Sequence, residues 1–539
     1  MIEAAKNLAV ITILLSAGFS FASAQQIPHL RKQGSATQLI VDGKPFLIRG
    51  GELGNSTASN REYMARYWDM LARLNVNTLL VPVYWELIEP EEGRFDFTSF
   101  DWFVADAGKN NFKVVPLWFG SWKNSMSSYV PAWVKKDQRR FPRSIGRDGR
   151  GMEILSPFSD ENIKADAAAF RAMMRHIRET DRNSTVVMVQ VENEIGMIPD
   201  ARDRSDIADQ LYASEIPTDL AAYLQRSGNS LVPELRSIWV ANGMKIRGTW
   251  EQVFGPGITT EEIFIAWYFA KFTERVTSAG KAEHPLPMFV NAALIRPGHS
   301  PGQYPSGGPL PHLFDIWRVG SPSIDFLSPD IYFQNFSEWT RKYDRGGNPF
   351  FIPEAGTFPM VAVNMLYAVG QHNAIGVSPF AIESVDEPIA GQLTAAYDIL
   401  RQLEPEILSR QGSSSIAGLL SEGAEQRQAL RLSMNGYGVY VSFDKPASPT
   451  DPPPLSGGLA IALGPDEFLF AGTAMTITFE SDKPTGETIG LLSVDEGSYV
   501  EGKWKAGRRL NGDQTHQGRH VRIPAGRFDI QRVKLYRYR

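Results

Sequence analysis

Short runs of β-branched and aromatic residues alternate with longer stretches of helical period over residues 37–405. The helical stretches repeat apolar residues three or four positions apart, as in Asp160–Arg178. The strand-like runs are Phe46–Arg49, Thr78–Val83, Lys113–Leu117, Val186–Val191, Met288–Asn291, Phe326–Ile331, Phe350–Ile352 and Gly376–Phe380. Eight βα units in this order predict a closed parallel (β/α)8 TIM barrel.

The pattern changes after Leu403. Short alternating runs follow one another, separated by clusters of Gly, Pro and Asp such as Pro452–Pro454. This pattern is typical of an antiparallel β domain. We therefore predict an α/β fold with the catalytic barrel over residues 25–405 and a smaller, sandwich-like antiparallel β domain over 406–539.

Residues 1–24 have the form of a cleaved secretory signal peptide. Lys6 precedes the apolar stretch Leu8–Ala22, and Ala22-Ser23-Ala24 places small residues where a signal peptidase cleaves. The stretch is shorter than the ~20 residues of a membrane-spanning helix. The alternative is a membrane anchor that is not cleaved, because Glu3 weakens the positive charge of the segment before the apolar stretch. We expect an exported protein, periplasmic or extracellular, that has no membrane association after cleavage.

Composition and charge exclude several function classes. With 43% apolar and 21% charged residues, the chain is too apolar to be disordered. The 55 basic and 60 acidic residues give a net charge of −5, and no basic block occurs, which argues against nucleic-acid binding. The absence of cysteine removes disulfides, thiolate metal sites and a cysteine nucleophile.

Acidic residues follow two of the predicted barrel strands. The fourth strand runs into Glu192-Asn193-Glu194, and the seventh into Glu354. Since barrel strands carry their reactive groups at their carboxyl ends, two carboxylates should face each other there. Such a pair suits glycoside hydrolysis and needs no metal or cofactor. Alternation puts Glu192 and Glu194 on one side, so spacing does not decide which is catalytic. The alternative to a catalytic role is that these acids only form salt bridges at the strand ends.

Two segments resemble glycoside hydrolase family 35, the β-galactosidases of clan A. Residues 189–196, Val-Gln-Val-Glu-Asn-Glu-Ile-Gly, are similar to the family's fourth-strand motif. Residues 83–97, in which a tryptophan is followed by Glu-Pro and then Gly-x-Phe-Asp-Phe, resemble its second-strand motif. The resemblance implies that Glu194 is the general acid/base, that Glu354 is the nucleophile, and that Asn193 bonds the sugar 2-hydroxyl.

The first and third strands depart from the family pattern. Glu52 and Asn55 match substrate-binding positions, but Gly54 replaces a histidine between them, and Ser121 stands where the family has an acid. These differences fit a divergent branch that carries an extra C-terminal β domain. The resemblance to that branch suggests galactosylated xyloglucan side chains as substrate.

Aromatic residues beyond the strand ends are candidates for a sugar-stacking platform. They are Trp118, Trp122 and Tyr332, the last of which could also bond the nucleophile. Core packing is the alternative for Trp118 and the better explanation for Trp85. The sequence therefore predicts a retaining exo-β-galactosidase acting on oligo- or polysaccharides. A β-mannosidase or arabinosidase, and a sugar-binding barrel without turnover, are the alternatives.

Overall fold

A computed structural model describes residues 26–422, 429–446, 448, 450–483 and 486–539. The predicted signal peptide lies outside these ranges, so export stays a prediction. Among the helices of the described residues, none combines the length and apolarity of a membrane-spanning segment.

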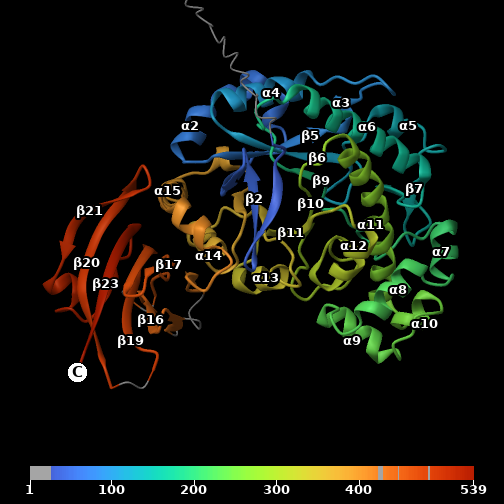
Figure 1. Ribbon diagram of the computed structural model, residues 1–539. Helices are drawn as coiled ribbons and strands as arrows, with labels where there is room; N and C mark the ends of the chain where they lie inside the picture. The colour runs from blue at the N-terminus through green and yellow to red at the C-terminus, as the bar shows by residue number, and fades with distance from the viewer. Residues whose placement is uncertain (1–25, 423–428, 447, 449, 484–485) are drawn as a thin grey trace, which may run out of the picture.

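Eight parallel strands close into a barrel in chain order, which confirms the predicted TIM barrel (Figure 1). The strands are β4 (Ile48–Glu52), β5 (Thr78–Tyr84), β6 (Lys113–Lys123), β9 (Val189–Asn193), β10 (Met288–Ala293), β11 (Phe326–Ile331), β12 (Ile352–Ala355) and β13 (Gly376–Pro379). Strand β6 is longer than predicted and continues six residues beyond Leu117.

Helices surround the barrel and fill the connections between its strands. They are α1 (Arg61–Ala65), α2 (Trp68–Arg73), α3 (Trp85–Ile88), α4 (Thr98–Lys109), α5 (Ala132–Lys136), α6 (Asp160–Thr180), α7 (Asp206–Tyr212), α8 (Thr218–Ser227), α9 (Pro233–Ala241), α10 (Trp250–Phe254), α11 (Ile258–Glu283), α12 (Phe314–Gly320), α13 (Phe336–Tyr343), α14 (Val361–Gln371) and α15 (Ile389–Arg410). Helix α6 matches the predicted stripe and begins where the Ser159 side chain accepts a hydrogen bond from the Asn162 N–H. The connection between β6 and α6 also contains a hairpin, β7 (Arg143–Ile145) and β8 (Gly151–Leu155).

An N-terminal sheet that the sequence analysis did not predict packs on the amino-terminal end of the barrel. It consists of β1 (His29–Gln33), β2 (Ala36–Val41) and β3 (Lys44–Phe46). Leu39 and Val41 of β2 belong to one apolar cluster with Phe289, Phe326 and Phe351, which lie early in their barrel strands or just before them. The opposite end of the barrel remains open for a pocket.

The C-terminal region forms two antiparallel sheets, as predicted. The larger sheet contains β14 (Ile416–Leu420), β17 (Gly457–Gly464), β18 (Glu467–Thr473), β20 (Thr488–Val500), β21 (Lys503–Leu510) and β23 (Asp529–Tyr538). The smaller contains β15 (Leu430–Met434), β16 (Tyr437–Phe443), β19 (Met475–Ser481) and β22 (Val521–Ile523). Figure 1 shows both sheets at one side of the barrel, next to α14 and α15.

The barrel and the C-terminal sheets share one apolar core. Leu459, Ile461 and Leu469 of the larger sheet belong to the same buried cluster as the barrel helices. The boundary predicted at residue 405 falls inside α15, which continues to Arg410 because Leu403 and Ile407, one turn apart, are both buried.

Gly370 of α14 marks a close approach between these parts. A Cβ added there would lie 2.4 Å from Leu459 Cδ2 and 2.9 Å from the Ala417 carbonyl oxygen. We expect Gly370→Ala to lower the free energy of unfolding by roughly 1–3 kcal/mol through overpacking. The matched change Gly391→Ala, at an exposed position of α15 next to a flexible glutamate side chain, should be neutral or stabilising. Equal effects in denaturant titrations would contradict the close packing.

Candidate active site

A cavity of about 520 Å³ lies at the carboxyl-terminal end of the barrel strands. Lys123 is the last residue of β6, and Glu194 directly follows β9. Asp330 and Glu354 are the second-last residues of β11 and β12. All four line the cavity. The two predicted catalytic glutamates therefore meet in one pocket, as expected for strands four and seven of a barrel.

The carboxyl groups of the pocket lie close together. One carboxylate oxygen from each of Glu194, Asp330 and Glu354 lies within 4.8 Å of the others. This spacing is close to the ~5–5.5 Å that separates the carboxyl groups of retaining glycosidases. The three carboxylates could also ligate a cation, so catalysis without a metal stays a prediction.

Two left-handed residues explain how Glu192 and Glu194 separate. Their φ angles are 60° and 48°, which breaks the strand alternation that would place both side chains on one side. Glu194 lines the cavity, whereas Glu192 is buried and accepts a hydrogen bond from the Trp122 N–H (2.8 Å). Burial and the neighbouring Asp166 hold the pKa of Glu192 well above its usual range. Glu192 therefore belongs to the wall of the barrel.

Burial and mutual repulsion keep protons in the pocket. Burial, followed by the charge of Glu354, raises the pKa of Glu194 to about 7, against an opposing effect of Lys123. The pKa values of Glu52 and Asp330 are raised well above their usual range by burial and, second, by Glu354. Glu194 can thus hold a proton near neutrality, as a general acid must.

Hydrogen bonds tie the other predicted residues to this centre. The Tyr332 phenol donates to Glu354 Oε1, and Glu52 shares a hydrogen bond with the same carboxylate. Asn193 Oδ1 accepts a hydrogen bond from Lys123 Nζ (3.0 Å), while its Nδ2 has no partner among the described residues. Asn55 lines the cavity. The structure therefore brings these four predicted residues to the site; their contacts with a sugar stay predictions.

The stacking role predicted for Trp118 and Trp122 is wrong. Both rings are 0% exposed, because β6 continues through Lys123 and carries them inside the wall rather than beyond it. Trp118 Nε1 donates to Asp166 of α6 (2.8 Å). Trp122 packs edge-on against Phe272 of α11, with ring centroids 4.6 Å apart. No sugar face can reach either ring, so both residues belong to the core.

Several pocket residues were not predicted from the sequence. Lys123, Asn124, Asn291 and Asp330 contact or flank Glu194. Asn291 accepts a hydrogen bond from the Glu194 N–H (3.0 Å) and donates one to Asp330 (2.6 Å). A polar residue near the end of an apolar strand was the available signal for Asn291 and Asp330.

The two departures from the family pattern have local explanations. Gly54 leaves space for Glu383, whose Oε1 accepts hydrogen bonds from the Gly54 N–H (2.9 Å) and the Thr57 hydroxyl (2.5 Å). A Cβ at Gly54 would lie 2.9 Å from that oxygen. The N–H of Ser121 donates to Asp166 (2.9 Å) in the wall, so the residue at the family's acidic position does not line the cavity.

Comparison with known families places the pocket in context. Residues 56–267 match the glycoside hydrolase family 42 model, described as "Beta-galactosidase". Residues 393–522, which begin in α15 and cover most of the C-terminal sheets, match a "Domain of unknown function (DUF5597)". The first match includes Glu194 and ends before Glu354. Residues 56–267 are thus similar to glycoside hydrolases of the β-galactosidase type, and the predicted membership in family 35 is not confirmed, since family 42 is indicated.

Individual relatives match part of the chain. A β-galactosidase of Xanthomonas manihotis is 27% identical over 198 residues, which span 35% of this chain and 30% of that protein. The β-galactosidase structure from Rahnella sp. R3 has 18% identity and a TM-score of 0.46, covering 67% of this chain and 57% of that one. The structure from Bacillus circulans sp. alkalophilus has 16% identity and a TM-score of 0.46, covering 68% and 57%.

The electrostatic coupling predicts a direct titration result. A carboxyl resonance in a ¹³C-glutamate NMR titration should have a pKa of about 7 and should disappear in Glu194→Gln. In Glu354→Gln the same pKa should fall, because removing a neighbouring negative charge favours the ionised form. The control Glu91→Gln, an exposed residue outside the cavity, should leave the pKa unchanged. An unchanged Glu194 pKa in Glu354→Gln would contradict the coupling.

Proposed function

We propose that this protein is a retaining exo-β-galactosidase that releases terminal β-D-galactose from oligo- or polysaccharides. One observation carries the proposal: Glu194 and Glu354 offer carboxylate oxygens within 4.8 Å of each other inside a cavity, with Glu194 able to hold a proton near neutrality. The match of residues 56–267 to a family described as "Beta-galactosidase" supports galactose as the sugar.

The first step forms a galactosyl-enzyme. A carboxylate oxygen of Glu354 attacks the anomeric carbon, and the bond from that carbon to the leaving oxygen breaks. Glu194 gives its proton to the leaving oxygen, so that a neutral alcohol departs. The Tyr332 phenol, bonded to Glu354, holds the nucleophile in its orientation.

The second step returns the enzyme to its starting state. Once Glu354 is an ester its negative charge is gone, and the pKa of Glu194 falls because that charge is its second largest cause of elevation. The Glu194 carboxylate then takes a proton from water as the water oxygen attacks the anomeric carbon. The bond to Glu354 breaks, and galactose leaves with its β configuration.

The family resemblance assigns the contact with the sugar 2-hydroxyl to Asn193, whose buried side chain adjoins the cavity through Lys123. Its side-chain oxygen is held by Lys123, so the amide Nδ2 is oriented and remains without a partner among the described residues. A hydrogen bond to the 2-hydroxyl that strengthens in the transition state contributes to catalysis in glycosidases. The resemblance to the divergent family branch suggests the side-chain galactose of xyloglucan as substrate.

Replacement of the nucleophile tests the double displacement. Glu354→Ala should abolish hydrolysis of nitrophenyl β-D-galactopyranoside while circular dichroism remains unchanged. Added azide should restore turnover and yield α-galactosyl azide, because azide attacks once from the face that Glu354 vacates. Retention of ordinary activity in Glu354→Ala would show that the nucleophile is misassigned.

Replacement of the acid tests the role of Glu194. Glu194→Ala should slow substrates with poor leaving groups, such as lactose, by roughly 10²–10⁴-fold, the usual contribution of a general acid. Dinitrophenyl galactoside, whose leaving group needs no proton, should be affected far less in its first step. Equal losses on both substrates, measured as kcat/KM, would exclude an acid role for Glu194.

A further inference from the structure

A second cavity of about 520 Å³ adjoins the catalytic pocket. The β7–β8 hairpin lines it over residues 146–154, and Met126 and residues 198–200 complete it. Ile198 lines both cavities, so the second lies next to the first at this residue. None of the predicted catalytic or sugar-binding residues lies in it.

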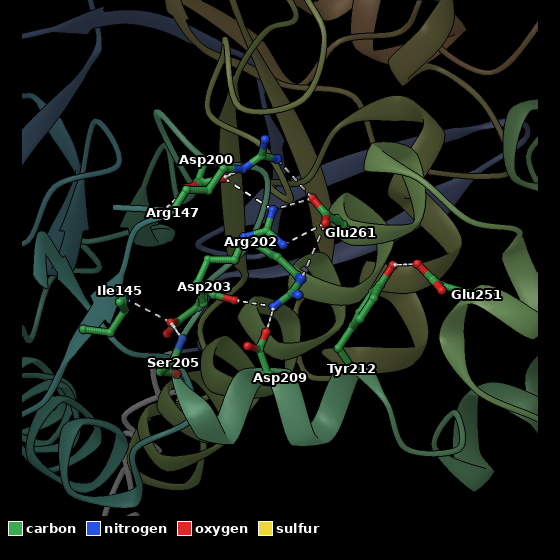
Figure 2. A network of polar contacts seen from close by, with 11 residues as sticks. Ile145, Arg147, Asp200, Arg202, Asp203, Ser205, Asp209, Tyr212, Glu251 and Glu261 are labelled. Atoms are coloured by element: carbon green, nitrogen blue, oxygen red, sulfur yellow. Dashed lines mark hydrogen bonds and ion pairs between the residues drawn. The ribbon is translucent and has the colours of Figure 1, made fainter. Parts of the chain in front are cut away.

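An ion-pair network holds this groove in shape (Figure 2). Arg147, at the hairpin tip, donates to buried Asp200 from Nε (2.7 Å) and from its backbone N–H (2.9 Å). The guanidinium of Arg204 donates two hydrogen bonds to Glu261 of α11 (2.7 and 2.6 Å). Asp203 accepts a bond from the last backbone N–H of β7 (3.0 Å). The hairpin, the segment after β9 and α11 are thereby joined into one rigid wall.

The groove lies on the side of the pocket that contains the proposed general acid. Asn124 donates a hydrogen bond to the Glu194 carboxylate, and Met126, two residues further along the chain, lines the groove. Glu194 must approach the oxygen of the leaving group, whereas Glu354 must approach the anomeric carbon. A leaving group that extends past Glu194 therefore runs toward Asn124, Met126 and Ile198.

The lining suits a saccharide. Met126 is 38% exposed and lies with Ile198 and Pro199, which offers an apolar surface for sugar C–H groups. Arg150, whose side chain is 86% exposed and has its nearest carboxylate oxygen on Asp148 at 3.9 Å, offers donors to hydroxyl groups. Small-molecule sites combine such apolar surface with a few polar groups in cavities of about 300–1,000 Å³.

We propose that this groove binds the leaving-group portion of a galactosylated oligosaccharide, one or more sugars beyond the bond that is cleaved. The inference rests on the proposed galactosidase function and adds its preference for a chain-like leaving group. Preorganised contacts between the groove and such a leaving group supply binding energy for catalysis. An aryl leaving group cannot use this binding energy. The unaltered protein should therefore show a higher kcat/KM on a galactosylated xyloglucan oligosaccharide than on lactose.

Two kinds of variant test the groove in the full chain. Met126→Ala/Arg150→Ala removes its contacts, and Gly151→Trp fills it, at a position where an added Cβ would meet only Arg143 side-chain carbons at 3.6 and 4.0 Å. We expect roughly a tenfold fall in kcat/KM on the xyloglucan oligosaccharide and less than about a twofold change on nitrophenyl galactoside. Arg94→Ala, an exposed arginine paired with Glu91 and outside both cavities, should change neither.

The outcomes separate the two proposals. The groove assignment would be overturned by an equal rate on lactose and on the oligosaccharide, or by groove variants that keep the full rate on the oligosaccharide. In either case, turnover of the aryl galactoside would still support the galactosidase function. Failure of the unaltered protein to hydrolyse any of the three galactosides would overturn both.

Discussion

Crowding of buried carboxyl groups is the constraint on which this pocket depends. Glu52, Glu194, Asp330 and Glu354 lie together and are each at most 6% exposed, so mutual repulsion and burial disfavour four negative charges in this group. Burial first, and then Glu354, raise the pKa values of the other three. A single lysine, Lys123, opposes this effect at Glu52 and Glu194. The acidity of Glu194 therefore depends on its neighbours, because the charge of Glu354 raises its pKa, whereas Lys123 and a hydrogen bond with Asp330 lower it.

The barrel and the meeting of two strand-end carboxylates in one pocket could be predicted, because both depend on short-range patterns. Apolar runs predicted all eight strands, and an acid after the fourth and seventh predicted the pair. The choice between Glu192 and Glu194 could not be predicted from alternation, since it depends on two left-handed residues that turn one side chain into the wall and the other into the pocket. The family resemblance, rather than periodicity, selected the residue that lines the cavity.

The predicted aromatic platform failed for a different reason. A run of apolar residues does not show where a strand stops, and β6 continues six residues past the expected end. Trp118 and Trp122 thereby pack against α6 and α11, and Lys123 takes the position at the pocket. The β7–β8 hairpin and strands β1 and β3 were missed because short, partly exposed strands have little apolar periodicity. The position of the hairpin depends on contacts between residues distant in sequence, such as the hydrogen bond from Arg147 to Asp200.

The apolar cluster that runs from the barrel helices into β17 and β18 bears on how this chain can change over evolution. A domain joined by a polar linker can be exchanged between proteins, whereas here α14 fits against the sheets through a glycine with no room for a methyl group. A recombination event that joined these sheets to a different barrel would leave Leu459 and its neighbours facing solvent. The two parts should therefore be inherited together, with compensating substitutions on the two sides of their contact.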